Sequence, residues 1–150
     1  MWGQHHMSDG VRSVAVELAG EVVVGDGAGD VIRSTREHHG FTQSWLAPRL
    51  GVRRESLSRI ESGQSNPTLG VVDRFARVMA LAHHVRQATA RSEKATSTPD
   101  PGGFDAAGRA LDLTPEETEA IAAEAVSQYR AKRESLLEGV DADADGGSSR

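Results

Sequence analysis

The chain has 150 residues and a formal net charge of −5, and aromatic residues make up only 4% of it, so one domain with extensions must build an aliphatic core. It contains no cysteine, which excludes disulfide frameworks, thiolate zinc sites and cysteine nucleophiles. No apolar run approaches the ~20 residues that span a bilayer and no secretory leader follows the start, so we expect a soluble, cytoplasmic protein.

The spacing of apolar residues and of glycines predicts an all-α protein. Helices are expected over residues 11–24, 30–39, 43–50, 53–62, 69–91, 104–111 and 115–137. Gly40, Gly51 and Gly63 follow three of them, and glycine readily adopts the left-handed conformation that ends a helix. In the long helix one apolar stripe is expected to face the core: Leu69, Val72, Phe75, Ala76 and Met79.

Side-chain oxygens are predicted to cap several of these helices at the first turn, where backbone N–H groups lack partners. The expected caps are Asp30, Thr42, Thr68 and Thr114. Two alternatives remain open. Residues 22–24, three consecutive valines, could form a short strand, and the long helix could kink near Leu81.

The charge distribution along the chain is uneven. Residues 30–91 carry ten arginines against five acidic residues, whereas the remainder carries seven basic against 17 acidic residues. A basic module between acidic extensions is typical of proteins that bind nucleic acids. The expected segments are a disordered start, a helix with a Gly-rich loop, the basic module, a linker, a helical segment for dimerisation and a disordered acidic tail: residues 1–10, 11–29, 30–91, 92–103, 104–138 and 139–150.

Residues 42–61, TQSWLAPRLGVRRESLSRIE, predict two short helices that meet at a tight turn around Gly51. Ala47, four residues before that glycine, is small enough for the second helix to cross closely. The crossing angle is expected to be fixed by five apolar residues, Leu46, Leu50, Val52, Leu57 and Ile60.

On these residues and their neighbours, the segment from Val31 to Leu81 resembles the Cro/repressor-type helix-turn-helix family, often called the XRE family. The matching residues are Ile32, Arg36, Gly40, Phe41, Thr42, Gln43, Leu46, Ala47, Leu50, Gly51, Val52, the run from Ser56 to Glu61, Gly63, and the run from Asn66 to Leu69. The helix and Gly/Asp-rich loop that precede this segment are similar to those of some archaeal members. The resemblance implies a five-helix DNA-binding domain, usually dimeric, that acts as a transcription regulator.

The resemblance also implies an ion pair between Arg36 and Glu61 that ties the first helix of the domain to the third. Two residues depart from the family pattern. Pro48 lies inside the second helix, where it removes a backbone hydrogen bond and predicts a kink or a tighter turn. Arg53 stands where the family usually has a Ser or Thr cap, which predicts a loss of about 1 kcal/mol of capping, offset if Arg53 reaches a phosphate.

The helix over residues 53–62 is interpreted as a recognition helix that enters the major groove of double-stranded DNA. At about 100° per residue, its polar side chains share one face, opposite Leu57 and Ile60. On that face Arg54 suits the O6 and N7 acceptors of guanine, and Glu55 suits the amino group of cytosine. The residues expected to contact bases or phosphates are Thr42, Gln43, Ser44, Arg53, Arg54, Glu55, Ser58, Arg59, Ser65 and Asn66.

The last predicted helix carries an apolar seam from Ile121 to Leu137. This seam predicts either a homodimer formed through the helix or packing of the helix on its own domain. A homodimer would bind a pseudo-palindromic DNA site.

No motif of an enzyme or a cofactor site stands in a matching context, so we expect a regulator, repressor or activator, that uses no cofactor. Histidines occur only as the adjacent pairs 5–6, 38–39 and 83–84, and neighbours on a helix point in different directions, so no metal site is expected. Two alternatives use the same fold: an antitoxin-like module whose C-terminal segment masks a toxin, and a coactivator-like module that bridges transcription proteins.

Overall fold

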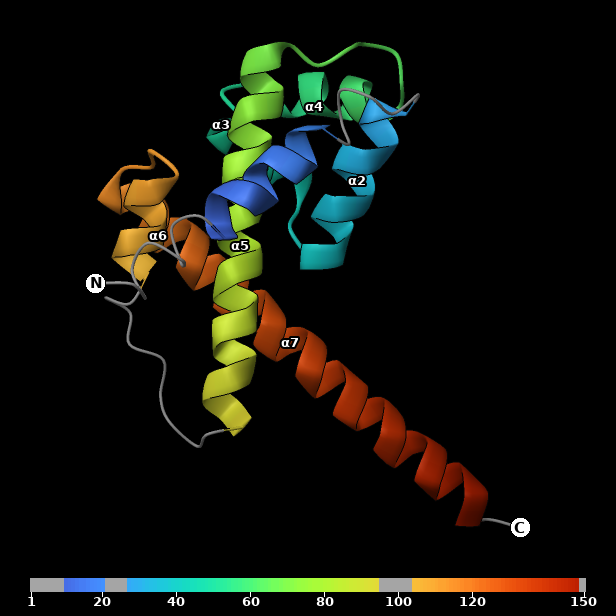
Figure 1. Ribbon diagram of the computed structural model, residues 1–150. Coiled ribbons are helices and arrows are strands. Elements are labelled where there is room, and N and C mark those ends of the chain that lie inside the picture. The colour runs from blue at the N-terminus through green and yellow to red at the C-terminus, as the bar shows by residue number, and fades with distance from the viewer. Residues whose placement is uncertain (1–9, 21–26, 95–103, 149–150) are drawn as a thin grey trace.

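The computed structural model describes residues 10–20, 27–94 and 104–148, and the regular structure within these ranges is all helical, which confirms the predicted fold class (Figure 1). An N-terminal helix covers residues 10–20. The helices that follow are α2 (Ala28–His39), α3 (Gln43–Arg49), α4 (Arg54–Glu61), α5 (Leu69–Lys94), α6 (Asp105–Ala110) and α7 (Pro115–Ser148). None of the helices in these ranges combines the length and the apolar character needed to cross a membrane.

Helix α5 runs through the middle of the molecule and is contacted by α2, α6 and α7 (Figure 1). The core around it is aliphatic, as the scarcity of aromatic residues requires. Ile32 of α2, Leu46 of α3, Leu57 of α4 and Phe75 of α5 are all completely buried. Full burial of each such side chain stabilises the fold by about 1.5–3 kcal/mol. The four helices therefore share one core.

The ends of the short helices follow the capping residues and the glycines. The Thr42 hydroxyl accepts a hydrogen bond from the backbone N–H of Trp45 at 3.1 Å, and Thr68 and Thr114 cap α5 and α7 in the same way. Gly40, Gly51 and Gly63 have φ values of 77°, 74° and 82°, in the left-handed region where other residues are strained. These predicted caps and stops are confirmed.

The start of α2 differs from the prediction. The helix begins at Ala28 with Gly27 at the cap position, so Asp30 lies inside the first turn and does not cap it. Gly29, expected in a loop, is helical, and at this residue α2 passes very close to the end of α4. A Cβ atom at Gly29 would lie 2.1 Å from the carbonyl oxygen of Ile60. The valines at 22–24 and residues 1–9 lie outside the described residues.

Helix α5 is continuous from Leu69 to Lys94. The predicted linker therefore begins too early, since its first three residues are helical and residues 95–103 lie outside the described part. Leu69 was also expected in the core but is 79% exposed. It is the first residue of α5, where its side chain lies beyond the neighbouring helices.

The last turn of α3 is tightened, which agrees with the expectation for Pro48. The N–H of Leu50 donates to the carbonyl oxygen of Ala47 at 3.1 Å, three residues earlier, as well as to that of Leu46 at 3.2 Å. Such i to i−3 bonds are characteristic of a tightened helical turn.

Helix α7 extends to Ser148, so the prediction of disorder from residue 139 onward is wrong over 139–148. No proline interrupts the chain after Pro115, and adding residues to an existing helix requires no new nucleation. The two halves of the seam differ in burial. Ile121, Ala122 and Ala125 are buried within their own chain, whereas Leu136 and Leu137 are 65% and 56% exposed.

His39, at the C-terminal end of α2, is half-buried and stacks on Phe41 with 5.6 Å between the ring centroids. Burial lowers the pKa of His39 to about 4, and the neighbouring His38, Arg86, His83 and Lys132 lower it further in the same direction. The imidazole is therefore neutral at neutral pH in the folded protein.

We expect the His39 imidazole to make the domain less stable as the pH falls from neutral toward 4. The unfolded imidazole titrates near pH 6.5 and the folded one near 4, so in this window protons bind preferentially to the unfolded chain. The melting temperature of His39→Gln, measured in chloride buffers, should decline less with pH than that of the parent. Identical pH slopes would show that His39 does not contribute.

Candidate nucleic-acid interface

Helices α3 and α4 form a helix-turn-helix unit around Gly51. Leu46 and Ala47 on α3 face Leu57 and Ile60 on α4, and all four side chains are buried. Because these apolar contacts occupy one side of each helix, the polar residues of α4 are left on the opposite side.

That opposite side of α4 is exposed. Its exposed residues are Arg53, Arg54, Glu55, Ser58, Arg59 and Ser62. At about 100° per residue, positions 54, 55, 58 and 62 share one face of the helix, with 59 at its edge. Arg53 forms the N-cap of α4 and makes no side-chain capping hydrogen bond, in agreement with the predicted loss of a cap.

Three arginines give this surface a positive charge. Within the part of the chain that the structure describes, Arg53, Arg54 and Arg59 form no ion pair. The arginines of the supporting helices differ, since Arg36 and Arg74 are both paired with carboxylates. The charge of the α4 surface is therefore available to an anionic partner.

The structure places Arg36 and Glu61 in a bidentate ion pair between α2 and α4. Arg36 donates from Nε to Oε2 and from Nη2 to Oε1 of Glu61, both at 2.8 Å, and from Nη1 to the carbonyl oxygen of Phe41 at 2.8 Å. The side chains of Arg36 and Glu61 are only 11% and 3% exposed. The Glu61 hydrogen bonds raise the pKa of Arg36.

Gln43 occupies a position that sequence reasoning did not foresee. Its Nε2 donates to Oε1 of Glu61 at 3.1 Å, so its amide completes the buried network instead of pointing outward. Gln43 and Glu61 are 18 residues apart in sequence, and no local signal indicates the contact. Of the other residues expected to hold phosphates, Ser44, Ser65 and Asn66 are exposed, as is Thr42, whose hydroxyl caps α3.

Arg49 and Arg74 connect the helix-turn-helix unit to the rest of the domain, and the sequence did not predict these contacts. The Arg49 guanidinium lies 4.0 Å from the Trp45 ring centroid. Arg74 of α5 donates to the Arg49 carbonyl oxygen at 3.1 Å and forms two hydrogen bonds with Glu117 of α7. These bonds lower the pKa of Glu117. They connect the end of α3 to α5 and α7.

Residues 28–89 match the family described as a helix-turn-helix domain. A protein of Archaeoglobus fulgidus, named an uncharacterized HTH-type transcriptional regulator, is 45% identical over 47 residues, which cover 31% of this chain and 67% of that protein. A relative of the same name in Methanothermobacter thermautotrophicus is 38% identical over 53 residues, 35% of this chain and 77% of that protein. Another from A. fulgidus is 33% identical over 64 residues, only 28% of that protein. No solved structure gives a significant match.

The chain thus belongs to the helix-turn-helix family of transcriptional regulators, in agreement with its Cro/repressor-type sequence pattern. It is a DNA-binding regulator and not an enzyme, as expected. Within the described residues, no group of three or more His, Asp or Glu side chains is arranged to hold a metal ion.

Replacing Glu61 should strongly destabilise the domain. Glu61→Ala leaves the Arg36 guanidinium buried without its carboxylate, and breaking a buried pair in this way costs about 3–5 kcal/mol. Thermal or denaturant unfolding of the variant measures the loss of stability.

Glu37→Ala is the matched control, because Glu37 is an exposed glutamate that also lies 3.8 Å from Arg36. Its exposed pair with Arg33 contributes about 0.5 kcal/mol or less. Equal losses in the two variants would contradict the importance of burial.

Proposed function

We propose that the protein is a cytoplasmic, sequence-specific transcription regulator that inserts α4 into the major groove of double-stranded DNA. The observation that carries this proposal is the exposed polar face of α4, with its three arginines lacking a carboxylate partner in the described chain. The opposite face of the helix is buried, so only this face is free to enter a groove. The groove is wide enough to admit one α-helix.

The residues on this face divide into base and phosphate contacts. Arg54, in the first turn, reaches the O6 and N7 acceptors of a guanine, and Glu55 accepts from a cytosine amino group. Arg53, at the N-cap of α4, and Arg59, at the edge of the face, hold phosphates and contribute affinity without sequence preference. Ser58 lies between them on the same face. The exposed side chains that add phosphate contacts are Thr42, Ser44, Ser65 and Asn66.

Alanine substitutions separate these roles. Arg54→Ala should weaken binding to the cognate duplex by about 1–3 kcal/mol and affect a scrambled duplex far less. Arg53→Ala and Arg59→Ala should weaken both duplexes similarly and lower the slope of log affinity against log salt concentration by about one. Binding isotherms at two salt concentrations measure all three effects.

The cognate duplex for this experiment comes from genome-wide mapping of binding sites. Arg109→Ala, which removes an exposed arginine of α6 far from α4 in sequence, controls for the loss of one charge. Equal weakening of both duplexes by Arg54→Ala would contradict its role in base recognition. If Arg109→Ala weakened binding to both duplexes as much as Arg53→Ala does, the assignment of the phosphate contacts to α4 would be wrong.

We also infer a homodimer that binds a pseudo-palindromic site with half-site centres about 34 Å apart. The support is the C-terminal part of α7, which extends away from the remaining helices (Figure 1) and bears the exposed Leu136 and Leu137. Adjacent exposed leucines on a projecting helix are typical of a helix that pairs with another. The first half of the seam is buried within its own chain, so the dimer contact is confined to this end.

Removing the two leucines should produce a monomer. The double variant Leu136→Glu, Leu137→Glu replaces the apolar contact with charges, and light scattering on the full chain should show half the mass of the parent. Val16→Glu, at an exposed apolar residue of the N-terminal helix, is the control and should remain dimeric. A parent that is monomeric at micromolar concentration and binds a single asymmetric site would contradict the dimer.

A further inference from the structure

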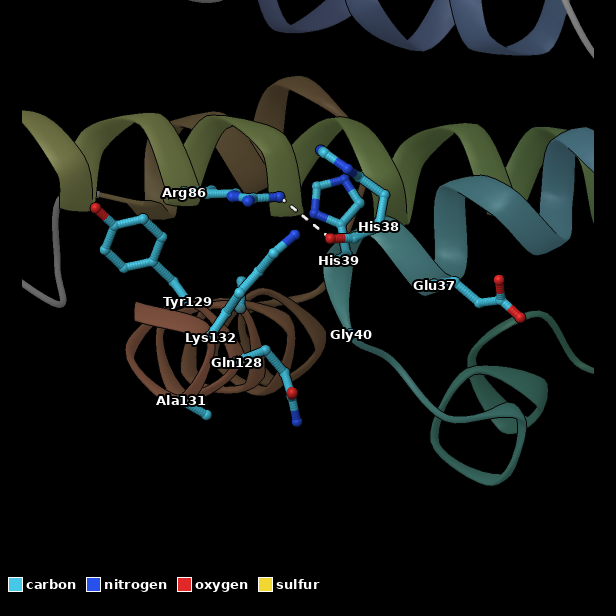
Figure 2. A pocket seen from close by; sticks show the side chains of 10 residues that line it. Glu37, His38, His39, Gly40, Arg86, Gln128, Tyr129, Ala131 and Lys132 are labelled. Atoms are coloured by element: carbon cyan, nitrogen blue, oxygen red, sulfur yellow. Dashed lines mark hydrogen bonds between the residues drawn. The ribbon is translucent and has the colours of Figure 1, made fainter. Parts of the chain in front are cut away.

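A cavity of about 310 Å³ lies where the end of α2 meets α5 and α7 (Figure 2). Its wall includes His38 and His39 of α2, Arg86 of α5, and Tyr129 and Lys132 of α7. The volume is at the lower end of the range of about 300–1,000 Å³ that small-molecule sites occupy. The cavity lies outside the helix-turn-helix unit formed by α3 and α4.

Arg86 and Lys132 are the permanent cations of this wall. Arg86 donates from Nη1 to the carbonyl oxygen of His38 at 3.3 Å. This bond does not use the N–H groups on Nε and Nη2 of Arg86. In Figure 2 the Lys132 side chain extends from α7 toward Arg86 and His39. Within the described residues, neither cation has a carboxylate partner.

Most arginines on the same three helices are paired with carboxylates. Their ion pairs are Arg33–Glu37, Arg36–Glu61, Arg74–Glu117, Arg77–Asp73 and Arg133–Glu93. Among the described groups, Arg86 and Lys132 are thus unpaired cations of the cavity wall, whereas Glu37, the acidic residue that also lines it, is paired with Arg33 and Arg36.

The acidic groups near the cavity are held by other partners. The Glu37 carboxylate lies away from the cations and accepts from Arg33 at 3.1 Å (Figure 2). Glu93 accepts a hydrogen bond from the Tyr129 hydroxyl at 3.1 Å and is paired with Arg133. Glu124 accepts from the Gln128 amide at 2.9 Å.

The imidazoles of His38 and His39 experience the positive charge of the cavity. Burial is the largest cause that lowers both pKa values, and Arg86 and Lys132 lower both of them further, as does His83. Both imidazoles are neutral at neutral pH, and each then carries one N–H group that can donate to a bound acceptor.

We propose that this cavity binds a small anion with a phosphate or carboxylate group, held by Arg86 and Lys132 and accepting a hydrogen bond from His39. Charge-assisted hydrogen bonds to an anion are about twice as strong as neutral ones. Because the groups come from α2, α5 and α7, a bound anion connects the C-terminal helix to the DNA-binding domain. This proposal does not depend on how α4 recognises DNA.

The test is a titration of the full chain with inorganic phosphate, followed through the imidazole resonances by NMR at constant ionic strength in chloride. The His39 resonance, assigned with His39→Gln, should shift and saturate. His84, which lies edge-on to Phe104 at 6.1 Å and does not line this cavity, should not shift. Lys132→Gln should weaken phosphate binding about tenfold, the equivalent of one lost charged hydrogen bond of about 1.4 kcal/mol.

Arg130→Gln is the matched control, because it removes one exposed positive charge from α7 without changing the cavity. It should bind phosphate as the parent does. The proposal is overturned if the His39 shift fails to saturate in the parent, or if Lys132→Gln and Arg130→Gln bind equally well. It is also overturned if Lys132→Gln lowers DNA affinity in phosphate-free buffer and Arg130→Gln does not. Lys132 would then contact the DNA backbone.

Discussion

Burial of the Glu61 carboxylate at the end of α4 constrains the helices around it. A carboxylate this deeply buried is destabilising unless every hydrogen-bonding position is satisfied. Its partners come from two other helices, the Arg36 guanidinium of α2 and the Gln43 amide of α3, and Arg36 also donates to Phe41 in the connection between them. One carboxylate therefore sets the relative positions of α2, α3 and α4. Any change in the angle between α2 and α4 would break a charged hydrogen bond.

Helix α5 extends this arrangement to the C-terminal part of the chain. Its Arg74 bonds to the last residue of α3 and to Glu117 of α7, and Ile121 of α7 is buried in the same core. The first half of α7 is thus part of the folded domain and not an appended segment. A change in α7 near Glu117 acts on the helix-turn-helix unit through one arginine side chain.

The features that depend on local sequence could be predicted, and those that depend on distant contacts could not. Thr42 as a cap and Gly51 as a left-handed turn residue follow from backbone requirements within a few residues. The inward orientation of Gln43 depends on a carboxylate 18 residues away, and the requirement for glycine at position 29 depends on α4 passing at close range. The extension of α7 through a Gly- and Asp-rich sequence depends on a helix already formed upstream, which propensities counted residue by residue do not include.

The two ends of α4 are constrained very differently. Glu61 anchors the C-terminal end through charged hydrogen bonds, whereas Arg53 provides no side-chain cap for the N–H groups at the other end. Helices fray from an uncapped end because the first turn has fewer hydrogen bonds to lose. Within this eight-residue helix, the turn that contains Arg54 is therefore the end without a side-chain hydrogen bond to hold it. The residues proposed to read bases thus lie at the end of α4 opposite to the one that Glu61 anchors in the domain.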